Sequence, residues 1–457
     1  MSPSTLRARK LLAAADTSPL DDVAVVVRDG VVSEVRPWRE AEIVGEVVEV
    51  DGLLAPGFVD AHSHLRGLPL PEHGLPPRAF EAWICSLAAA TELDADDEAL
   101  VATTELLQTG VVAVQGFVDV GAGDDPLVSA RAALSGVARS GIRALVVLGF
   151  ADRALRTPEP PEGDWSRVPP AAAAMAADRI PRVARDWLAT ATPARVALGI
   201  GPVGGQWSSD ELLAAVAVID GVRRHTHLHE SRLHRGWLAG QPSPLDRLDA
   251  AGLLDGLLSG AHAVHLTDAE LDRLAAAGTA LVHCPTSNRA LRVGTADVRG
   301  WLDRGIPAGL GLDSQNTAAP DLFETLRDAR AISADAGRPL DATEVLALAT
   351  TGGARALGIA GGGRIAPGSP ADLVELVLPT SASDAEAIVE TGSPRAVRRV
   401  WVSGEEVVTD GRSLADPTAA RRRLRERLDA DRVARDARRE RLAPILDLVD
   451  GLAEARA

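Results

Sequence analysis

Apolar residues in the centre of the chain form short runs rich in Val, Ala, Leu and Ile, which alternate with stretches where apolar residues recur at helical spacing. The pattern predicts eight strands, over residues 57–64, 111–117, 142–150, 195–201, 223–230, 260–266, 279–285 and 307–314. Strands that alternate with helices are typical of βα units around a parallel sheet. Eight such units predict a closed (β/α)8 barrel.

The stretches between these strands carry helix start signals. Residues 94–110 and 267–278 open with Asp94 and Thr267, side chains that can cap a helix N-terminus. We therefore predict helices in both stretches. Residues 153–180, rich in Pro and Ala, follow the third strand and predict a long loop near the mouth of the barrel.

The two ends of the chain have a different pattern. Residues 1–56 show alternating apolar and polar positions with an Asp-Gly turn signal, and short strands separated by Gly and Pro return in residues 366–415. Chain ends commonly lie close together. The predicted fold class is therefore α/β, with a TIM-like barrel over residues 57–365 and a small β-sandwich built from both ends. The tail, residues 416–457, interleaves acids with arginines and predicts a charged helix with a solvated face.

Composition narrows the class of protein. Hydrophobic residues make up 46% and charged residues 25%, the balance of an ordinary globular protein. The net charge of −16 repels a phosphate backbone or an anionic membrane surface, so we expect neither nucleic acid nor membrane as a partner. No apolar run reaches the roughly 18 to 20 residues of a membrane helix, and we expect a cytoplasmic protein.

Two residue types bound the chemistry further. The cysteines, Cys85 and Cys284, stand in no CxxC motif or Cys/His cluster, so we expect small buried side chains rather than a redox or zinc-knuckle site. Lys10 is the single lysine. No lysine beyond the first ten residues is therefore available for a Schiff base, a P-loop or a carbamate bridge.

Histidines gather where the predicted strands end. His62 and His64 close the first barrel strand. Because side chains alternate along a strand, both imidazoles lie on one face, where one metal ion could take both. The fifth strand carries His225, His227 and His229, again on one face, and any of the three could be a ligand.

Further polar residues stand at the ends of the fifth, sixth and eighth strands. Glu230 follows the fifth strand, and Asp313 ends the eighth. On the sixth strand His262 and His265 are three apart, so a regular strand cannot turn both inward. Barrel enzymes keep their catalytic residues at the carboxyl ends of the strands. The shared rim therefore predicts one metal and catalytic site.

Six motifs of this chain match motifs of a known family, and they occur in the same order along the sequence. They are LLAPGFVDAHSHLRG (53–67), HLHES (227–231), GAHAVHL (260–266), HCPTSN (283–288), GLGLDS (309–314) and GRIAPGSPADLVEL (363–376). Through them the chain resembles the amidohydrolase superfamily, and within it the mononuclear cytosine, guanine and adenosine-type deaminases and the triazine hydrolases. The resemblance covers nearly the whole chain.

The resemblance implies roles for individual residues. The metal ligands it implies are His62, His64, His227 and Asp313. Glu230 matches the family's proton-shuttling acid, His262 matches the residue that hydrogen-bonds the attacked centre, and Asp313 would also orient the water. His225 and His229 match no required role.

The lysine count separates subtypes of this family. Binuclear members need a carbamylated lysine on a barrel strand, which this chain lacks. We therefore expect one divalent metal ion per subunit, zinc in the first place, although histidine and carboxylate ligands also suit iron or manganese. Such an ion lowers the pKa of its water from 15.7 to about 7. Glu230 is then placed to move a proton from that water to a ring nitrogen of the substrate.

The substrate is less well defined by the sequence. Candidate substrate contacts are Arg66, Gln206, Trp207 and Asn288. Gln206 could pair with an amide-like ring edge, and Trp207 could stack on a planar ring or fill the barrel mouth. Arg66, Glu72 and His73 could line the pocket or lie in a solvated loop.

Three functions stay open at this level. The first is deamination of a heterocyclic amine such as a purine, pterin, pyrimidine or triazine. The second is hydrolysis of a C–Cl, C–N-alkyl or cyclic amide bond at the same site. The third is a barrel scaffold without activity, against which the complete ligand set argues. In the first two the partner is a small-molecule substrate, and the resemblance leaves a homo-oligomer open.

Overall fold

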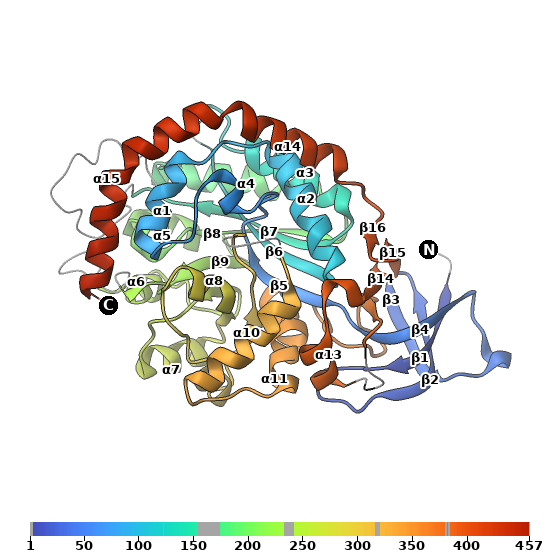
Figure 1. Cartoon of the computed structure of the whole chain (residues 1–457). Helices are drawn as coiled ribbons and strands as arrows, with labels where there is room; N and C mark the ends of the chain where they lie inside the picture. Colours follow the sequence, from blue (N-terminus) through green and yellow to red (C-terminus); the bar gives the residue numbers. More distant parts are fainter. Residues whose placement is uncertain are drawn as a thin grey trace.

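A computed structural model describes residues 3–121, 123–153, 174–232, 242–315, 320–379, 382 and 384–456, with side chains to residue 451. Its centre is a sheet of eight parallel strands (Figure 1). They are β5 (Phe58–Ser63), β6 (Val111–Asp119), β7 (Arg143–Phe150), β8 (Val196–Pro202), β9 (Arg224–Leu228), β10 (Leu258–His262), β11 (Ala280–His283) and β12 (Ala308–Leu310). Each overlaps one of the eight predicted strands, so the barrel prediction is confirmed.

The first and last strands of this sheet meet beside the predicted ligands. Ser63 and Asp313 form a parallel bridge between the end of β5 and the segment after β12. The backbone N–H of Asp313 donates to the carbonyl of His62 at 2.8 Å. The barrel is therefore closed by the same residues that carry the candidate chemistry.

Helices surround the barrel and connect its strands (Figure 1). They are α1 (Phe80–Ser86), α2 (Ala95–Gln108), α3 (Val128–Ser140), α4 (Ile180–Leu188), α5 (Asp210–Ala217), α6 (Pro244–Ala250), α7 (Asp268–Ala277), α8 (Pro285–Ala290), α9 (Val298–Asp303), α10 (Leu322–Asp335), α11 (Ala342–Ala347), α12 (Gly353–Leu357) and α13 (Ala385–Thr391). The side chains of Asp94 and Thr267 accept from the backbone N–H groups of Asp97 and Glu270. Both predicted caps are therefore confirmed.

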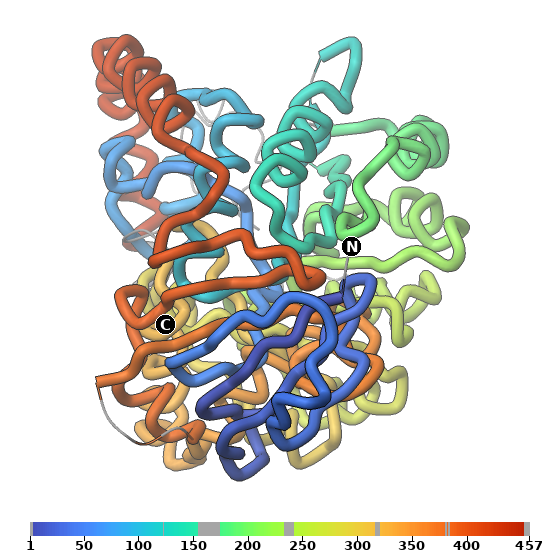
Figure 2. The backbone as a smooth tube through the Cα atoms, turned by 90° about the vertical axis from the view of Figure 1, so that its right-hand side faces the viewer, coloured from blue at the N-terminus to red at the C-terminus, as the bar shows by residue number. Residues whose placement is uncertain are grey.

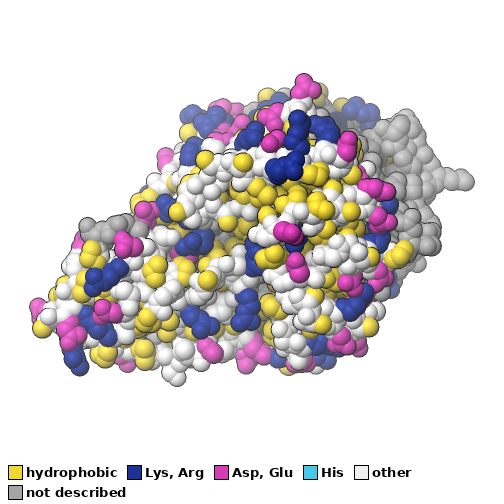
Figure 3. Space-filling view, turned by 180° about the vertical axis from the view of Figure 1, so that it is seen from behind, with side chains coloured by type: hydrophobic (Ala, Val, Ile, Leu, Met, Phe, Trp, Pro, Cys, Tyr) yellow, Lys and Arg dark blue, Asp and Glu magenta, His cyan; other side chains and the backbone are white. Residues whose placement is uncertain are grey.

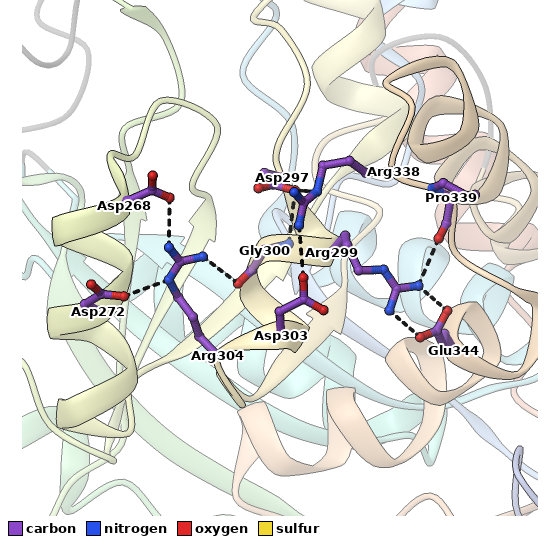
Figure 4. Close-up of polar contacts among 10 residues, drawn as sticks. All are labelled: Asp268, Asp272, Asp297, Arg299, Gly300, Asp303, Arg304, Arg338, Pro339 and Glu344. Carbon is purple, nitrogen blue, oxygen red and sulfur yellow. Dashed lines mark hydrogen bonds and ion pairs between the residues drawn. The ribbon is translucent and has the colours of Figure 1, made fainter.

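Arginine side chains tie neighbouring outer helices together (Figure 4). Arg304, at the end of α9, contacts Asp268 and Asp272 of α7, each at 2.8 Å. Arg299 of α9 forms two bonds to the carboxylate of Glu344 in α11. The planar guanidinium can hold two acceptors at once, so a single arginine joins two elements.

Strands from both chain ends form a second, mixed sheet of eight strands. They are β1 (Ser4–Leu11), β2 (Leu20–Arg28), β3 (Val31–Pro37), β4 (Glu46–Pro56), β13 (Leu373–Leu376), β14 (Val397–Val402), β15 (Glu405–Thr409) and β16 (Arg412–Ser413). β13 pairs with β4, which places the two ends side by side (Figure 2). Leu11, Val25 and Leu54 are buried with Trp401 in a core of their own. The predicted small β domain made from both ends is confirmed, while the domain boundaries drawn from the sequence stay predictions.

The charged tail forms α14 (Thr418–Ala430) and α15 (Arg432–Arg456), which arch over α1 and α2 (Figure 1). We expected a solvated helix, and the arginine-rich face of α14 is exposed. The opposite face is not, because Leu424 and Leu428 pack with Leu100 and Val101 of α2. We did not predict this packing, because the tail sequence has few apolar residues among its many charged ones. The tail is therefore part of the folded body of the protein.

We predict that Leu424→Ala lowers the free energy of unfolding by about 2–5 kcal/mol, the usual cost of removing a buried leucine side chain. Leu424 is 1% exposed, whereas Leu414, its control, is 63% exposed. Leu414→Ala should change stability by less than about 0.5 kcal/mol. Urea titration measures both, and equal small effects would show that the tail does not pack in solution.

On the surface seen from behind, acidic and basic side chains lie interspersed (Figure 3). Arginine and carboxylate groups can thus pair across this face. Among the helices that the structure describes, none combines the length and the apolar character needed to cross a membrane.

Candidate metal and catalytic site

Four side chains from three strands converge at the carboxyl end of the barrel. His62 lies in β5 and His64 directly after it, His227 lies in β9, and Asp313 follows β12. The Nε2 atoms of His64 and His227 are 3.2 Å apart. Asp313 Oδ1 lies 3.4 Å from His62 Nε2 and 3.3 Å from His64 Nε2. The sequence predicted that these residues meet, and the structure brings them together.

These distances fit a tetrahedral metal site. Bonds of about 2.0–2.1 Å to a tetrahedral zinc ion place neighbouring donor atoms roughly 3.4 Å apart. His62 Nε2 is buried with no hydrogen-bond partner, which is costly unless another group uses its lone pair. One donor atom of His262 also lies within 4.8 Å of donor atoms of His62 and Asp313. The donor set, three imidazoles and a carboxylate, therefore suits one divalent cation.

The protonation states of this cluster also suit a cation. Burial raises the pKa of Asp313, but the close approach of His62, whose Nε2 lies 3.4 Å from Oδ1, and the other nearby histidines outweigh burial and hold that pKa well below its usual range. Burial lowers the pKa of His64 to about 3, with only partial opposition from Asp313. At neutral pH the carboxylate is charged and the imidazole neutral, the forms that bind metals.

Partners behind the ligands fix their orientation. His227 Nδ1 donates to the carbonyl of Val203 at 2.7 Å, which leaves Nε2 for the cluster. Ser287 donates from Oγ to Asp313 Oδ2 at 2.5 Å. Such partners orient metal ligands, and an acceptor against Nδ1 also raises the basicity of an imidazole ligand.

Glu230 and His262 lie beside this cluster. Glu230 is 2% exposed, and burial, with contributions from Asp313 and Glu81, raises its pKa well above the usual range. His262 Nδ1 lies 2.9 Å from Asn288 Oδ1 and 3.8 Å from Glu230 Oε1. Burial lowers the pKa of His262 to about 4, so its ring is neutral at pH 7. A buried acid of raised pKa next to a neutral imidazole is equipped for proton transfer.

Strained backbone concentrates at the same rim. Leu65, His229, His262 and Asp313 all have positive φ, at 52°, 43°, 71° and 61°. Each such residue costs on the order of 1–3 kcal/mol and persists only where the surroundings enforce it. Because strain of this kind clusters at functional sites, it supports a functional site at the carboxyl ends of the strands.

A cavity of about 450 Å³ opens above the cluster. Its floor contains His64, His227, Glu230, His262 and Asp313. Apolar side chains from α1 and the following turn, η3 (Leu87–Ala89), form one wall, with Phe80 and Trp83 among them. Arg66, Glu98 and Asp119 bring charge to the lining. The volume lies in the range of pockets that bind a small heterocycle or a nucleoside.

The predicted substrate contacts divide into two groups. Arg66 and Trp207 line the cavity. Gln206 and Asn288 are buried but are not among its lining residues, and Asn288 instead contacts His262 from behind.

The other loop predictions have mixed outcomes. Glu72 forms an ion pair with Arg425 of α14, and His73 is buried outside the lining of the cavity. Much of the loop predicted over 153–180, namely residues 154–173, lies outside the described part of the chain.

Sequence reasoning missed several residues of the site. Ser287 lies within the quoted motif HCPTSN, but nothing in that motif says which side chain reaches Asp313. Asp119 could have been found, because it ends β6 and so lies on the same rim as the other strand ends. Phe80 and Trp83 belong to a short helix whose pattern is indistinguishable from ordinary core packing.

Comparisons with known proteins give one family. A family model described as the amidohydrolase family matches residues 53–407. A 5-methylthioadenosine/S-adenosylhomocysteine deaminase of Haloarcula marismortui is 32% identical over 352 residues, which cover 72% of this chain and 73% of the relative.

Two solved structures share the fold. An adenosine deaminase from Xanthomonas campestris with bound zinc superposes with a TM-score of 0.79 at 24% identity, over 94% of this chain and 99% of the other. An atrazine chlorohydrolase from Arthrobacter aurescens complexed with zinc has a TM-score of 0.80 at 23% identity, over 93% of this chain and 100% of the other.

Proposed function

The chain belongs to the amidohydrolase family, and from this premise we propose that it is a metal-dependent aminohydrolase that removes ammonia from a heterocyclic amine. One observation carries the proposal: Glu230, a buried carboxylate of raised pKa, lines the cavity floor beside a cluster built for one cation. Deamination needs an acid and base at that place, since a proton must travel from water to the substrate.

The metal ligands in this proposal are His62, His64, His227 and Asp313. When bound there, a divalent ion acts as a Lewis acid and lowers the pKa of a water molecule to about 7. Zinc is the first choice, because three imidazoles and one carboxylate suit it and zinc is bound in the two structural neighbours described above. Iron and manganese remain alternatives.

Glu230 moves the proton in this scheme. Its carboxylate accepts a proton from the attacking water, holds it because of the raised pKa, and delivers it to a ring nitrogen next to the attacked carbon. Protonation of that nitrogen makes the carbon more electrophilic. The carboxylate, unprotonated again, can then take the remaining proton of the added hydroxyl and pass it to the departing amine, which leaves as ammonia. One residue thus serves as base and acid.

His262 holds the reacting atoms in place. Its Nδ1–H donates to Asn288 Oδ1, which leaves Nε2 as the nitrogen that can hydrogen-bond the reacting group. Asn288 is therefore a positioning residue rather than a substrate contact.

We predict that Asn288→Leu lowers kcat by about 10–100-fold, because the buried Nδ1–H of the reacting histidine loses its acceptor, which costs about 1–3 kcal/mol. KM and the zinc content should change little, since Asn288 does not line the cavity. Steady-state kinetics with metal analysis of the same preparation checks this. An unchanged kcat would remove Asn288 from the account.

The substrate we favour is an aminopurine nucleoside or its thioether derivative. Two observations support this choice: the relative described above is named for 5-methylthioadenosine and S-adenosylhomocysteine, and the cavity is large enough for a nucleoside. Phe80, Trp83 and Trp207 offer aromatic surface for a planar base. A cytoplasmic location stays a prediction from the sequence, and a homo-oligomer stays an open alternative.

The second candidate is hydrolysis of a C–Cl or C–N-alkyl bond, which the structural similarity to atrazine chlorohydrolase favours. A triazine that carries both amino and chloro groups separates the two. We expect the zinc-loaded protein to release ammonia from aminopurines and, where it accepts the triazine, ammonia rather than chloride. Chloride release from the triazine, with no ammonia from any aminated ring, would replace the first function by the second.

A further inference from the structure

His225 is a buried histidine that the proposed mechanism does not use. It lies in β9 with 0% exposure, two residues before His227. Its Nε2 is 2.8 Å from His62 Nδ1, and its Nδ1 is 2.8 Å from Ser259 Oγ. Gln115 Nε2 donates to the same Oγ at 3.2 Å. These four side chains form a continuous hydrogen-bonded chain that ends on a proposed metal ligand.

The direction of these hydrogen bonds determines which ring nitrogen of His62 carries the proton. Ser259 Oγ can accept from His225 Nδ1–H and Gln115, and donate to the carbonyl of Arg224 at 3.4 Å. His225 Nε2 is then unprotonated and accepts from His62 Nδ1–H. The single proton that a metal-binding His62 ring carries is thereby kept on Nδ1, and the lone pair of Nε2 stays available. In the opposite direction Nε2 of His62 would carry the proton and could not bind a cation.

The neighbouring ligand supports this direction. His227 has a backbone carbonyl, that of Val203, against its Nδ1, and a carbonyl can only accept. His227 is therefore held as the form with a proton on Nδ1 and a free Nε2. For His62 the acceptor against Nδ1 is a side chain instead of a backbone carbonyl, namely Nε2 of His225.

We propose that His225, oriented by Ser259 and Gln115, is a positioning residue that fixes the protonated nitrogen of His62 and so sets the affinity of the site for its metal. The inference rests on the metal site of the proposed function. Groups that hold a metal-binding histidine in this way usually contribute about 10–100-fold in metal affinity. Because the acceptor is an imidazole, its role can be tested by replacing it with another acceptor.

The test compares His225→Leu with His225→Gln by zinc competition against a chelator of known affinity. Leucine fills a similar volume without an acceptor, and we expect about 10–100-fold weaker binding. Glutamine supplies an amide oxygen that can accept from His62 Nδ1–H, and we expect most of the wild-type affinity to return. Melting curves of the metal-free proteins check that both variants fold.

If the leucine variant does not fold, Ser259→Ala removes the support of His225 and should weaken zinc binding several-fold. Wild-type affinity in the folded leucine or alanine variant would overturn the inference. So would a folded glutamine variant that binds as weakly as the leucine variant, since the effect would then be one of shape. A wild-type protein that binds no zinc would instead overturn the proposed metal site, and this inference with it.

Discussion

Glu230→Gln keeps the metal but lowers kcat by about 10³-fold, within the range of about 10²–10⁴ that a positioned acid–base group supplies. Glutamine has nearly the same shape as glutamate and cannot take or give the proton. Glu230 contributes no donor atom to the groups that could hold a metal ion among the described residues, so zinc content should stay near that of the wild type. Turnover and metal analysis of one preparation give both values.

A matched control is Glu270→Gln. Glu270 is also buried, at 5% exposure, but it caps α7 on the outside of the barrel. This variant should keep its kcat within about two-fold, since Glu270 does not reach the cavity. If Glu230→Gln turned over as fast as the control, the proton transfer would have to be assigned to another residue.

Asp313→Ala has the second large effect, because it removes the only carboxylate of the cluster. Asp313 Oδ1 lies within 3.4 Å of two histidine Nε2 atoms, so its loss leaves three imidazole donors and no carboxylate in the cluster. We expect zinc affinity to fall by more than about 100-fold, beyond the loss typical of a residue that only supports a ligand. Activity should fall with metal content.

The control for this variant is Asp372→Asn. Asp372 is likewise buried, at 8% exposure, and pairs with Arg143 at the first residue of β7, on the opposite end of the barrel. It should lower stability but leave zinc binding unchanged. An Asp313→Ala protein that still binds one zinc ion at wild-type affinity would show that the ligand set is wrong.

The common rim of the proposed metal site could be predicted from the sequence because a parallel barrel brings its strand ends together, whereas the four ligands were chosen through the resemblance to the amidohydrolase superfamily. His62, His227 and Asp313 are far apart in the chain, yet each lies near or just after the carboxyl end of a strand, and the alternation of strands and helices implied a common rim. The alternation of side chains along the fifth strand could not decide which of His225, His227 and His229 binds the metal. β9 ends at Leu228, and His229 takes a positive φ, so the regular pattern stops before it.

Other features depend on contacts that a single segment does not encode. The hydrogen bond from Ser287 to Asp313 and the one between His262 and Asn288 join separate elements through side-chain rotamers. The tail was expected to be solvated because charge dominates its sequence, and only the few leucines such as Leu424 show where α2 covers it. Charge patterns describe the exposed face of a helix and say little about a narrow buried one.

Ammonia release from 5-methylthioadenosine, S-adenosylhomocysteine and adenosine by the zinc-loaded wild-type protein tests the central claim most directly. We expect one ammonia for each deaminated nucleoside formed, and loss of the signal when a chelator removes the metal. The panel should extend to aminated pterins, pyrimidines and triazines, which would identify the ring if it is not a purine. A protein that holds one zinc ion per chain and releases no ammonia from any of these rings would contradict the account.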